Sequence, residues 1–519
     1  MDTLPDVSPV PFQKTVEKTL GWGALALLEI HMVLCPYREV LADYRCIQKA
    51  ERWFGLFLLV SALLYLVITA VRFPQSRCRF RTFFRRLLSF EQLYLVGLFF
   101  WYLFTVLLRQ VLIGRVYGGN YFADNDWWMF ITALMAFIMF PMSRVLGGEN
   151  MKRVFNPMLK LALLPHLVFY SWALWQYFHM NEVVFPSGTT LHMMQYSMEI
   201  GVNRNSVGAY GVTMMTMCLY LAAVEKGWRK IPYLFGTAVY TAVLILSNCR
   251  TSWYTAVLVI AAAGFLWTWT SLNEKHVLIR IGSGILISAA GVLLLQWLRS
   301  ELFTLLDAAI TRAAIATEPA APAVAAFSSH DLSAVPLVSS HIPSAIPLSP
   351  GINQYARYYT TGLSGRMKVY RACLYVMFHS KYCFLFGVTP TDVGPSLYRI
   401  CEVWDVFPHA HNFFLQIGMC FGVPCMLITI AFVISLMIRS IRLLFSKNRV
   451  LLPGFWMIPV VVMCMLSQDM MEAFLNSGGT LVCVFFYVFS GWITAIDNEQ
   501  KESEIRRNGV VSKQQKQLN

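Results

Sequence analysis

Long apolar runs alternate with short polar segments along most of the chain, and this pattern predicts membrane-spanning helices. A helix of roughly 20 apolar residues is long enough to cross the hydrocarbon core of a bilayer. By hydropathy we count about twelve such runs and therefore expect an all-α, polytopic membrane protein. The runs cover residues 19–35, 53–71, 92–108, 127–143, 161–179, 207–224, 231–248, 252–270, 277–297, 410–438, 451–467 and 475–496.

One polar segment, residues 298–409, is far longer than the others and separates the ninth run from the tenth. Its first part, 313–350, is rich in Ala, Pro and Ser and has almost no charge, a composition typical of disordered chain. In its second part, a basic stretch at 362–371 leads into the apolar run 372–378, which predicts helices lying at the membrane surface. We expect this segment to form one large loop between spans 9 and 10.

The composition agrees with a membrane protein and argues against a nucleic-acid partner. Of the 519 residues, 57% are hydrophobic and 13% are charged, whereas soluble proteins average roughly 25% charged residues. The net charge of +14 comes from basic residues between apolar runs, where membrane orientation accounts for them. Most of the 12 cysteines lie inside apolar runs as small hydrophobes. The spacing of Cys373, Cys383 and Cys401 leaves a disulfide among them open.

Basic residues gather on alternate connectors, and this asymmetry predicts the orientation of the chain. The basic connectors lie at 72–86, 144–160, 226–230 and 439–449, and the tail adds further basic residues. By the positive-inside rule these segments and both termini are cytoplasmic, although segment 36–52 fits poorly. The expected regions are a cytoplasmic N-terminus at 1–18, spans at 19–297, an extracytoplasmic loop at 298–409, spans at 410–496 and a cytoplasmic tail at 497–519.

Arg250 interrupts the apolar pattern between two spans that are joined by almost no loop. An arginine costs a few kcal/mol at the bilayer centre and less at its rim, where the expected topology places this residue. Two interpretations carry equal weight. Arg250 is a snorkelling interfacial arginine or a cap beside Thr251, or it binds an anion, since a guanidinium pairs bidentately with phosphate oxygens.

Two histidines, His409 and His411, follow Pro408, where proline suits the first turn of a helix. A lone histidine here would most simply form a hydrogen bond at the start of the helix. Beside Asn412, the better interpretation of His411 is a base, because an imidazole titrates near pH 6.5 and accepts a proton at neutral pH. His409 ranks second for this role, because after Pro408 it is equally a loop residue.

Gly418 and Gly422 lie seven and eleven residues beyond His411. The helical period therefore predicts that all three share roughly one face of a helix. The two glycines also form a G-x-x-x-G pair, which lets another helix approach closely. Their predicted role is structural.

Arg366 and Arg371 stand in the outer segment and have two interpretations. They serve an anionic substrate, or they hold a surface helix against lipid head groups. No cluster of His, Cys and Asp shows convincing metal spacing, so we expect neither a metal nor a cofactor.

The order of these features resembles the O-antigen ligase and polysaccharide polymerase family. The match covers roughly residues 200 to 430, and the earlier spans match only in character. The features are the stretch at 203–209, Ser-Asn-Cys-Arg-Thr-Ser at 247–252, Ser-Gly-Arg at 364–366, His-Asn-Phe-Phe-Leu at 411–415, and Gly418 with Gly422. The insertion at 313–350 departs from the family's usual compact outer segment.

The resemblance implies a metal-independent glycosyltransferase that takes glycan from undecaprenyl diphosphate-linked oligosaccharide outside the bacterial plasma membrane. In that case His411 is the general base, and Arg250 and Arg366 hold the diphosphate. Arg371, His409 and Asn412 are then further substrate contacts. The implied partners are the lipid-linked oligosaccharide, the lipid bilayer and other polysaccharide-assembly proteins.

The sequence leaves several functions open. A polymerase and a ligase share this chemistry and differ in the acceptor, and we prefer the polymerase. A transporter or flippase for lipid-linked glycans is an alternative, although such proteins often show two related halves, which we do not find here. A non-catalytic assembly or receptor protein would need neither Arg250 nor His411.

Overall fold

The computed structural model describes the chain in separate stretches. These are isolated positions between 26 and 33, residue 60, and residues 90–102, 104–105, 138–144, 148–179, 183–184, 190–194, 197–200, 204–272, 274–317, 363–390, 392–401, 409–445, 454–469 and 481–518. Most of the predicted spans 19–35, 53–71 and 127–143, and most of the Ala/Pro/Ser-rich segment 313–350, lie outside the described residues.

The described part of the chain is predominantly helical, and five of its helices are long and apolar enough to cross a membrane. Their apolar surfaces are consistent with a lipid bilayer. The count of about twelve spans and the membrane side of each loop remain predictions. The five helices are α7 (Gly148–Phe178), α8 (Arg204–Val224), α10 (Arg250–Ser271), α11 (Val277–Thr317) and α17 (Val423–Phe445).

Further helices and one small sheet make up most of the remaining described structure. The helices are α4 (Phe90–Tyr102), the 3-10 helix η4 (Gly227–Lys230), α9 (Ile231–Leu246), α13 (Leu363–His379), α14 (Lys381–Phe386), α15 (Val393–Cys401), α16 (Phe413–Phe421), α18 (Met457–Asp469) and α19 (Leu481–Leu518). The strands are β1 (Val183–Val184), β2 (Thr190–Met194) and β3 (Ser197–Ile200), paired antiparallel in that order. The predicted helical class is thus confirmed in its main feature, and the sheet is an addition to it.

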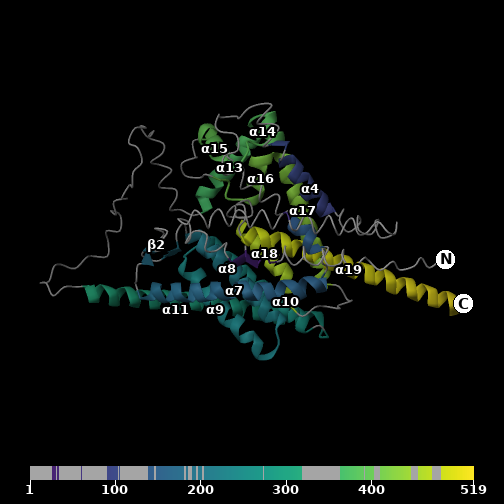
Figure 1. The fold of residues 1–519 in the computed structure, drawn as a ribbon, viewed down its shortest axis with the longest axis horizontal. Coiled ribbons are helices and arrows are strands. Elements are labelled where there is room, and N and C mark those ends of the chain that lie inside the picture. The colour runs from purple at the N-terminus through teal and green to yellow at the C-terminus, as the bar shows by residue number, and fades with distance from the viewer. Residues whose placement is uncertain are drawn as a thin grey trace.

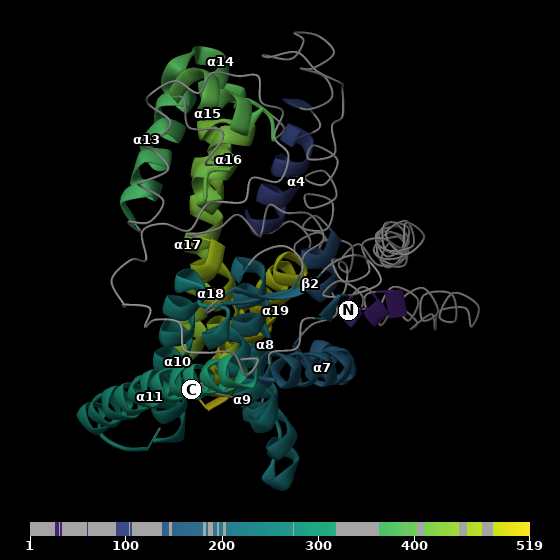
Figure 2. The same cartoon turned by 90° about the vertical axis from the view of Figure 1, so that its left-hand side faces the viewer.

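Two groups of helices meet around α17 and α18. In Figures 1 and 2, α13, α14, α15 and α16 gather at the top, and α7, α8, α9, α10 and α11 gather below. In the lower group α8 is central, because 78% of its most apolar 18-residue stretch is buried. Helix α11 is peripheral, because only 11% of the corresponding stretch is buried. An apolar helix with so little burial inside the protein needs another apolar medium around it, and a lipid bilayer supplies one.

The predicted span at 410–438 is two helices rather than one. Gly422 ends α16 in a left-handed conformation with φ +91°, which glycine adopts without steric cost. A Cβ at this position would lie 2.2 Å from the backbone oxygen of Leu385 in α14, so the two backbones are in close contact. Pro424 then stands in the first turn of α17, where its missing N–H costs little. The break therefore follows from Gly-x-Pro, a signal that hydropathy alone overlooks.

The predicted end of the ninth span at residue 297 also differs from the structure. Helix α11 continues to Thr317, so the first residues of the Ala/Pro/Ser-rich segment are helical. The helix predicted from 362–378 is confirmed as α13. In this helix and the next, Cys373 and Cys383 are buried thiols, so they are not joined to each other in a disulfide.

Buried charges join α4, α17 and α19. Arg439 of α17 pairs with Glu91 of α4 and with Asp497 of α19, each at 2.6 Å. Arg442 and Lys501 also pair with Asp497, at 3.2 and 2.8 Å. Burial raises the pKa of Glu91, but the guanidinium of Arg439 and hydrogen bonds to the carboxylate outweigh it, so the pKa lies below its ordinary value of 4.5. This network connects segments more than 300 residues apart in the sequence.

Candidate functional site

A tight turn between α9 and α10 positions Arg250 at the first residue of α10. Asn248 in this turn has φ +49°, a left-handed conformation that asparagine tolerates better than most residues. The hydroxyl of Ser247 donates to the backbone oxygen of Leu244 at 2.7 Å and ties the turn to the end of α9. The chain therefore reverses within three residues and presents Arg250 at the end of the helix pair.

Gly208 of α8 packs against this turn. A Cβ at Gly208 would lie 2.6 Å from Cβ of Cys249 and 2.9 Å from Oγ of Ser252, so only glycine allows this approach. The structure thus brings together two stretches that are about 40 residues apart in the sequence. Gly208 and Cys249 belong to two stretches that carry the family resemblance, of which residues 204–209 and 247–252 are described in the structure.

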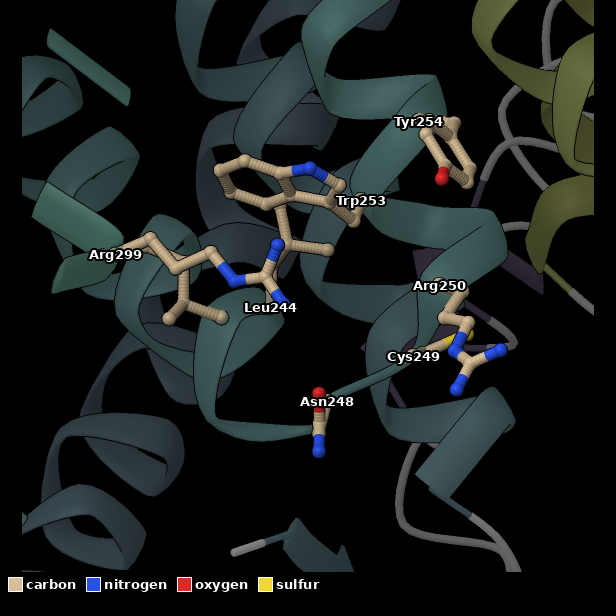
Figure 3. Close-up of a pocket in the computed structure, with 8 residues that line it drawn as sticks. Leu244, Asn248, Cys249, Arg250, Trp253, Tyr254 and Arg299 are labelled. Atoms are coloured by element: carbon tan, nitrogen blue, oxygen red, sulfur yellow. The ribbon is translucent and has the colours of Figure 1, made fainter. Parts of the chain in front are cut away.

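The side chain of Arg250 is exposed beside a cavity of about 160 Å³. No carboxylate in the described part of the chain forms an ion pair with this guanidinium. Figure 3 shows the cavity, with Arg250 at the start of α10 and Arg299 of α11 beside Trp253. The lining residues are Leu244, Ile245, Asn248, Cys249, Arg250, Trp253, Tyr254 and Arg299.

Arg366 reaches the same end of α10 from α13. Both terminal nitrogens of its guanidinium donate to the hydroxyl oxygen of Thr251, each at 3.3 Å. Thr251 is buried and directly follows Arg250, so two arginines predicted to share one anion lie at one helix terminus. The N-terminus of a helix itself favours negative charge, because its first N–H groups point outward and the helix dipole is positive there.

Tyr370 connects this end of α10 to His411. It lies one helical turn after Arg366 on α13, about 6 Å along the axis. Its hydroxyl donates to the backbone oxygen of His411 at 3.1 Å. One turn of α13 therefore contacts both Thr251 and the backbone of the predicted base.

The segment before α16 holds His411 in a defined backbone conformation. His411 has φ +49°, and its N–H donates to Nδ1 of His409 at 3.3 Å. The two imidazole rings pack with their centroids 3.9 Å apart. The N–H of Ala410 donates to Oε1 of Gln416 at 2.8 Å and ties the segment to α16. Accepting a bond at Nδ1 requires a lone pair there, so His409 in this contact is the neutral tautomer with its proton on Nε2.

Asn412 is the N-cap of α16. Its side-chain oxygen accepts a hydrogen bond from the N–H of Leu415 at 3.1 Å, which satisfies one of the unpaired donors at the helix start. Asn412 is also buried. These contacts show a structural role for the residue, and its predicted contact with substrate remains a prediction.

The predicted common face of His411, Gly418 and Gly422 is wrong. Helix α16 begins at Phe413 and ends at Phe421, so neither His411 nor Gly422 lies on it. The predicted close approach at the glycines is present, because a Cβ at Gly418 would lie 2.4 Å from Sδ of Met377 in α13. The two glycines contact different elements, α13 and α14, rather than one neighbouring helix.

Arg371 lies apart from these contacts. It is exposed on α13, and the described residues offer it no hydrogen bond or ion pair. The sequence analysis assigned no role in the site to Thr251, Tyr370 or Arg299. Tyr370 follows Arg366 by four positions, a spacing that places both on one helix face and could have identified it.

In the described ranges, no group of three or more His, Cys, Asp and Glu residues could hold a metal ion.

Comparison of the chain with models of known protein families found no match, and comparison with curated proteins found none either.

Proposed function

We propose that this chain is a membrane glycosyltransferase of cell-surface polysaccharide assembly. It takes glycan from undecaprenyl diphosphate-linked oligosaccharide at the outer face of a bacterial plasma membrane and extends another lipid-linked repeat. The observation that carries the proposal is the position of one turn of α13, where Arg366 contacts Thr251 beside Arg250 and Tyr370 contacts His411. The residues predicted to act in one reaction thus lie around a single helix, α13.

The arginines suit a reaction whose leaving group is a diphosphate. The bond between the sugar carbon and the phosphate oxygen breaks, and the oxygen keeps the electron pair. Negative charge grows on the diphosphate as it leaves, and guanidinium groups fixed in place stabilise that charge without reorganising. Arg250 and Arg366 supply two guanidinium groups at the N-terminus of α10, where the helix dipole adds to the same effect. Hydrogen bonds to Thr251 hold the guanidinium of Arg366 in place.

His411 provides a base for the acceptor. As the acceptor hydroxyl attacks the sugar carbon, its proton passes to the imidazole, and a carbon–oxygen bond forms as the bond to diphosphate breaks. A positioned base contributes roughly 10²–10⁴-fold to such a rate. The contacts of Tyr370 and His409 with the backbone of His411 restrict how the ring is presented.

Three assays on the purified protein in liposomes distinguish this function from its alternatives. Each uses an undecaprenyl diphosphate-linked oligosaccharide. Longer lipid-linked glycan supports the polymerase, and glycan transferred to an added lipid or protein acceptor indicates a ligase. Movement of the substrate across the bilayer without a change in its length indicates a flippase. If the protein shows none of these three activities, the result favours a non-catalytic assembly protein and contradicts the proposal.

A further inference from the structure

Arg299 of α11 lies on the same cavity as Arg250 and has no role in the proposed reaction so far. Helices α10 and α11 are consecutive and pack against each other, and Arg299 in the middle of α11 lies beside Trp253 at the start of α10. Arg299 lies two residues beyond the predicted end of the ninth span. By the same topology it is therefore at the membrane rim shared with Arg250.

Aromatic rings hold the guanidinium of Arg299 in place. Its central carbon lies 4.7 Å from the ring centroid of Trp253 and 5.8 Å from that of Phe303. Such cation–π contacts use the face of the guanidinium and leave the N–H donors at its edge available. Figure 3 shows the Arg299 side chain extending beneath the Trp253 ring.

The charge of Arg299 has no carboxylate partner among the described residues. Two other arginines, Arg439 and Arg280, donate hydrogen bonds to groups within the protein. Arg439 pairs with two carboxylates, and Arg280 donates to the backbone oxygen of Trp269 at 2.8 Å while stacking on that ring at 3.7 Å. Arg299 resembles Arg280 in its stacking and differs from it in facing a cavity.

The cavity has the size and the chemistry for a phosphate group. Its volume of about 160 Å³ is several times the roughly 30 Å³ that one water molecule takes up in the liquid. Arg250, Arg299 and Asn248 are among its lining residues, and the guanidinium and amide groups of these side chains can donate hydrogen bonds. We propose that Arg299, together with Arg250, binds a phosphate group of the substrate in this cavity.

This inference rests on the proposed function for the identity of the substrate, and it adds a third arginine to the diphosphate site. The phosphate group could belong to a lipid-linked diphosphate or to soluble diphosphate, so both probes are needed. Binding is measured in nanodiscs with undecaprenyl diphosphate, and in detergent with inorganic pyrophosphate. Neither measurement requires glycan transfer, so a failure of the glycosyltransferase proposal would be seen separately.

We expect Arg299→Gln to weaken binding of both probes roughly tenfold or more, because a charge-assisted hydrogen bond is lost. Arg299→Lys keeps the charge and should lose less. Arg280→Gln is the matched control, since it removes a stacked arginine from the other end of the same helix pair and should leave binding unchanged. If Arg299→Gln binds only undecaprenyl diphosphate more weakly, the lipid-linked form is the ligand. If it binds only pyrophosphate more weakly, the soluble form is the ligand. If Arg299→Gln binds both probes as tightly as the protein with Arg299, the proposal is overturned.

If a variant fails to fold, the proposal can be tested on the protein without substitutions. Phenylglyoxal modifies accessible arginines, and mass spectrometry locates the adducts. Either probe should protect Arg299 and Arg250, but not Arg229, which is exposed in η4. Equal modification of Arg299 with and without both probes contradicts a phosphate site at this residue.

Discussion

At the residue scale, His411 combines a titratable ring with an uncommon backbone conformation. Its φ of +49° lies in the left-handed region, where non-glycine residues are uncommon and Asn, Asp and His are enriched. The backbone oxygen and the N–H of this residue both form hydrogen bonds, to Tyr370 and His409. Substitutions of His411 therefore change a base and a backbone preference together, and the two effects need separating.

His411→Asn separates them, because asparagine also tolerates the left-handed conformation. We expect glycan transfer to fall by roughly 10²–10⁴-fold with little change in melting temperature. His411→Ala should lose transfer and also stability, since alanine tolerates that conformation less well. Rates of polymer formation and thermal melting of the purified variants test this. Near-normal polymer from His411→Asn would remove His411 from the catalytic role.

Arg250 offers a simpler test, because its side chain is exposed and holds no ion pair in the described structure. We expect Arg250→Ala to abolish glycan transfer and leave membrane insertion and melting temperature unchanged. The control is Arg229→Ala, which removes an equally exposed arginine from η4 and should leave transfer intact. Transfer at the normal rate by Arg250→Ala would favour the snorkelling interpretation of this arginine.

At the element scale, the break between α16 and α17 decides where the predicted base stands. Had residues 410–438 formed one straight helix, His411 would lie on its first turn and face the same side as the glycines. Instead α16 is short, and Asn412 caps it, so His411 lies in the segment that precedes it. The close contact of Gly422 with α14 fixes the position of the break.

Gly422→Ala tests this arrangement. We expect a loss of stability of at least about 1 kcal/mol, because φ +91° disfavours a side chain. The added Cβ would also lie 2.2 Å from the backbone oxygen of Leu385. Gly97→Ala is the matched control, since nothing lies within 4 Å of a Cβ there and alanine suits the interior of α4. The control should be neutral or stabilising by up to about 1 kcal/mol, and equal melting temperatures for the two variants would contradict the proposed role of Gly422.

At the scale of the whole molecule, the Glu91–Arg439–Asp497 network joins helices from the two ends of the chain. A buried charge that loses its partner is strongly destabilising, so these groups depend on one another. The network lies at segments that the charge pattern places on the cytoplasmic side. The arginines proposed to bind phosphate are predicted to lie on the opposite side, so the two clusters should be separable by experiment.

The lowered pKa of Glu91 makes this network sensitive to acid. A carboxylate with a lowered pKa in the folded protein contributes stability above its ordinary value of 4.5, and this contribution is lost as the pH falls through the folded value. We expect Glu91→Gln to lower the melting temperature at pH 7 and the difference from the unmodified protein to shrink below about pH 4.5. Melting curves from pH 7 to pH 3.5 in one detergent provide the test. A difference that stays constant with pH would show that ionisation of Glu91 is not involved.

Local sequence was sufficient to predict the helical class and the five long apolar helices in the described residues, and it supplied the candidate residues, whose roles stay predictions. Hydropathy and helix periodicity are properties of neighbouring residues, so a single sequence reveals them. Arg250 and His411 stand out because charged or titratable residues are uncommon where an apolar span meets the membrane rim. Arg366 was singled out by the Ser-Gly-Arg stretch of the family resemblance. The break at Gly422 was also encoded locally, by glycine and the proline that follows two residues later.

Only the tertiary structure decided which of these residues meet. Arg366 and Thr251 are 115 positions apart, and no periodicity relates them. Their contact exists because the long side chain of Arg366 reaches from α13 to the start of α10 in the folded chain. Arg299 shows the same limit, because its stacking on Trp253 and its cavity exist only when α11 folds back along α10. Side-chain identity shows what chemistry a residue can perform, and long-range packing determines which partner it performs it with.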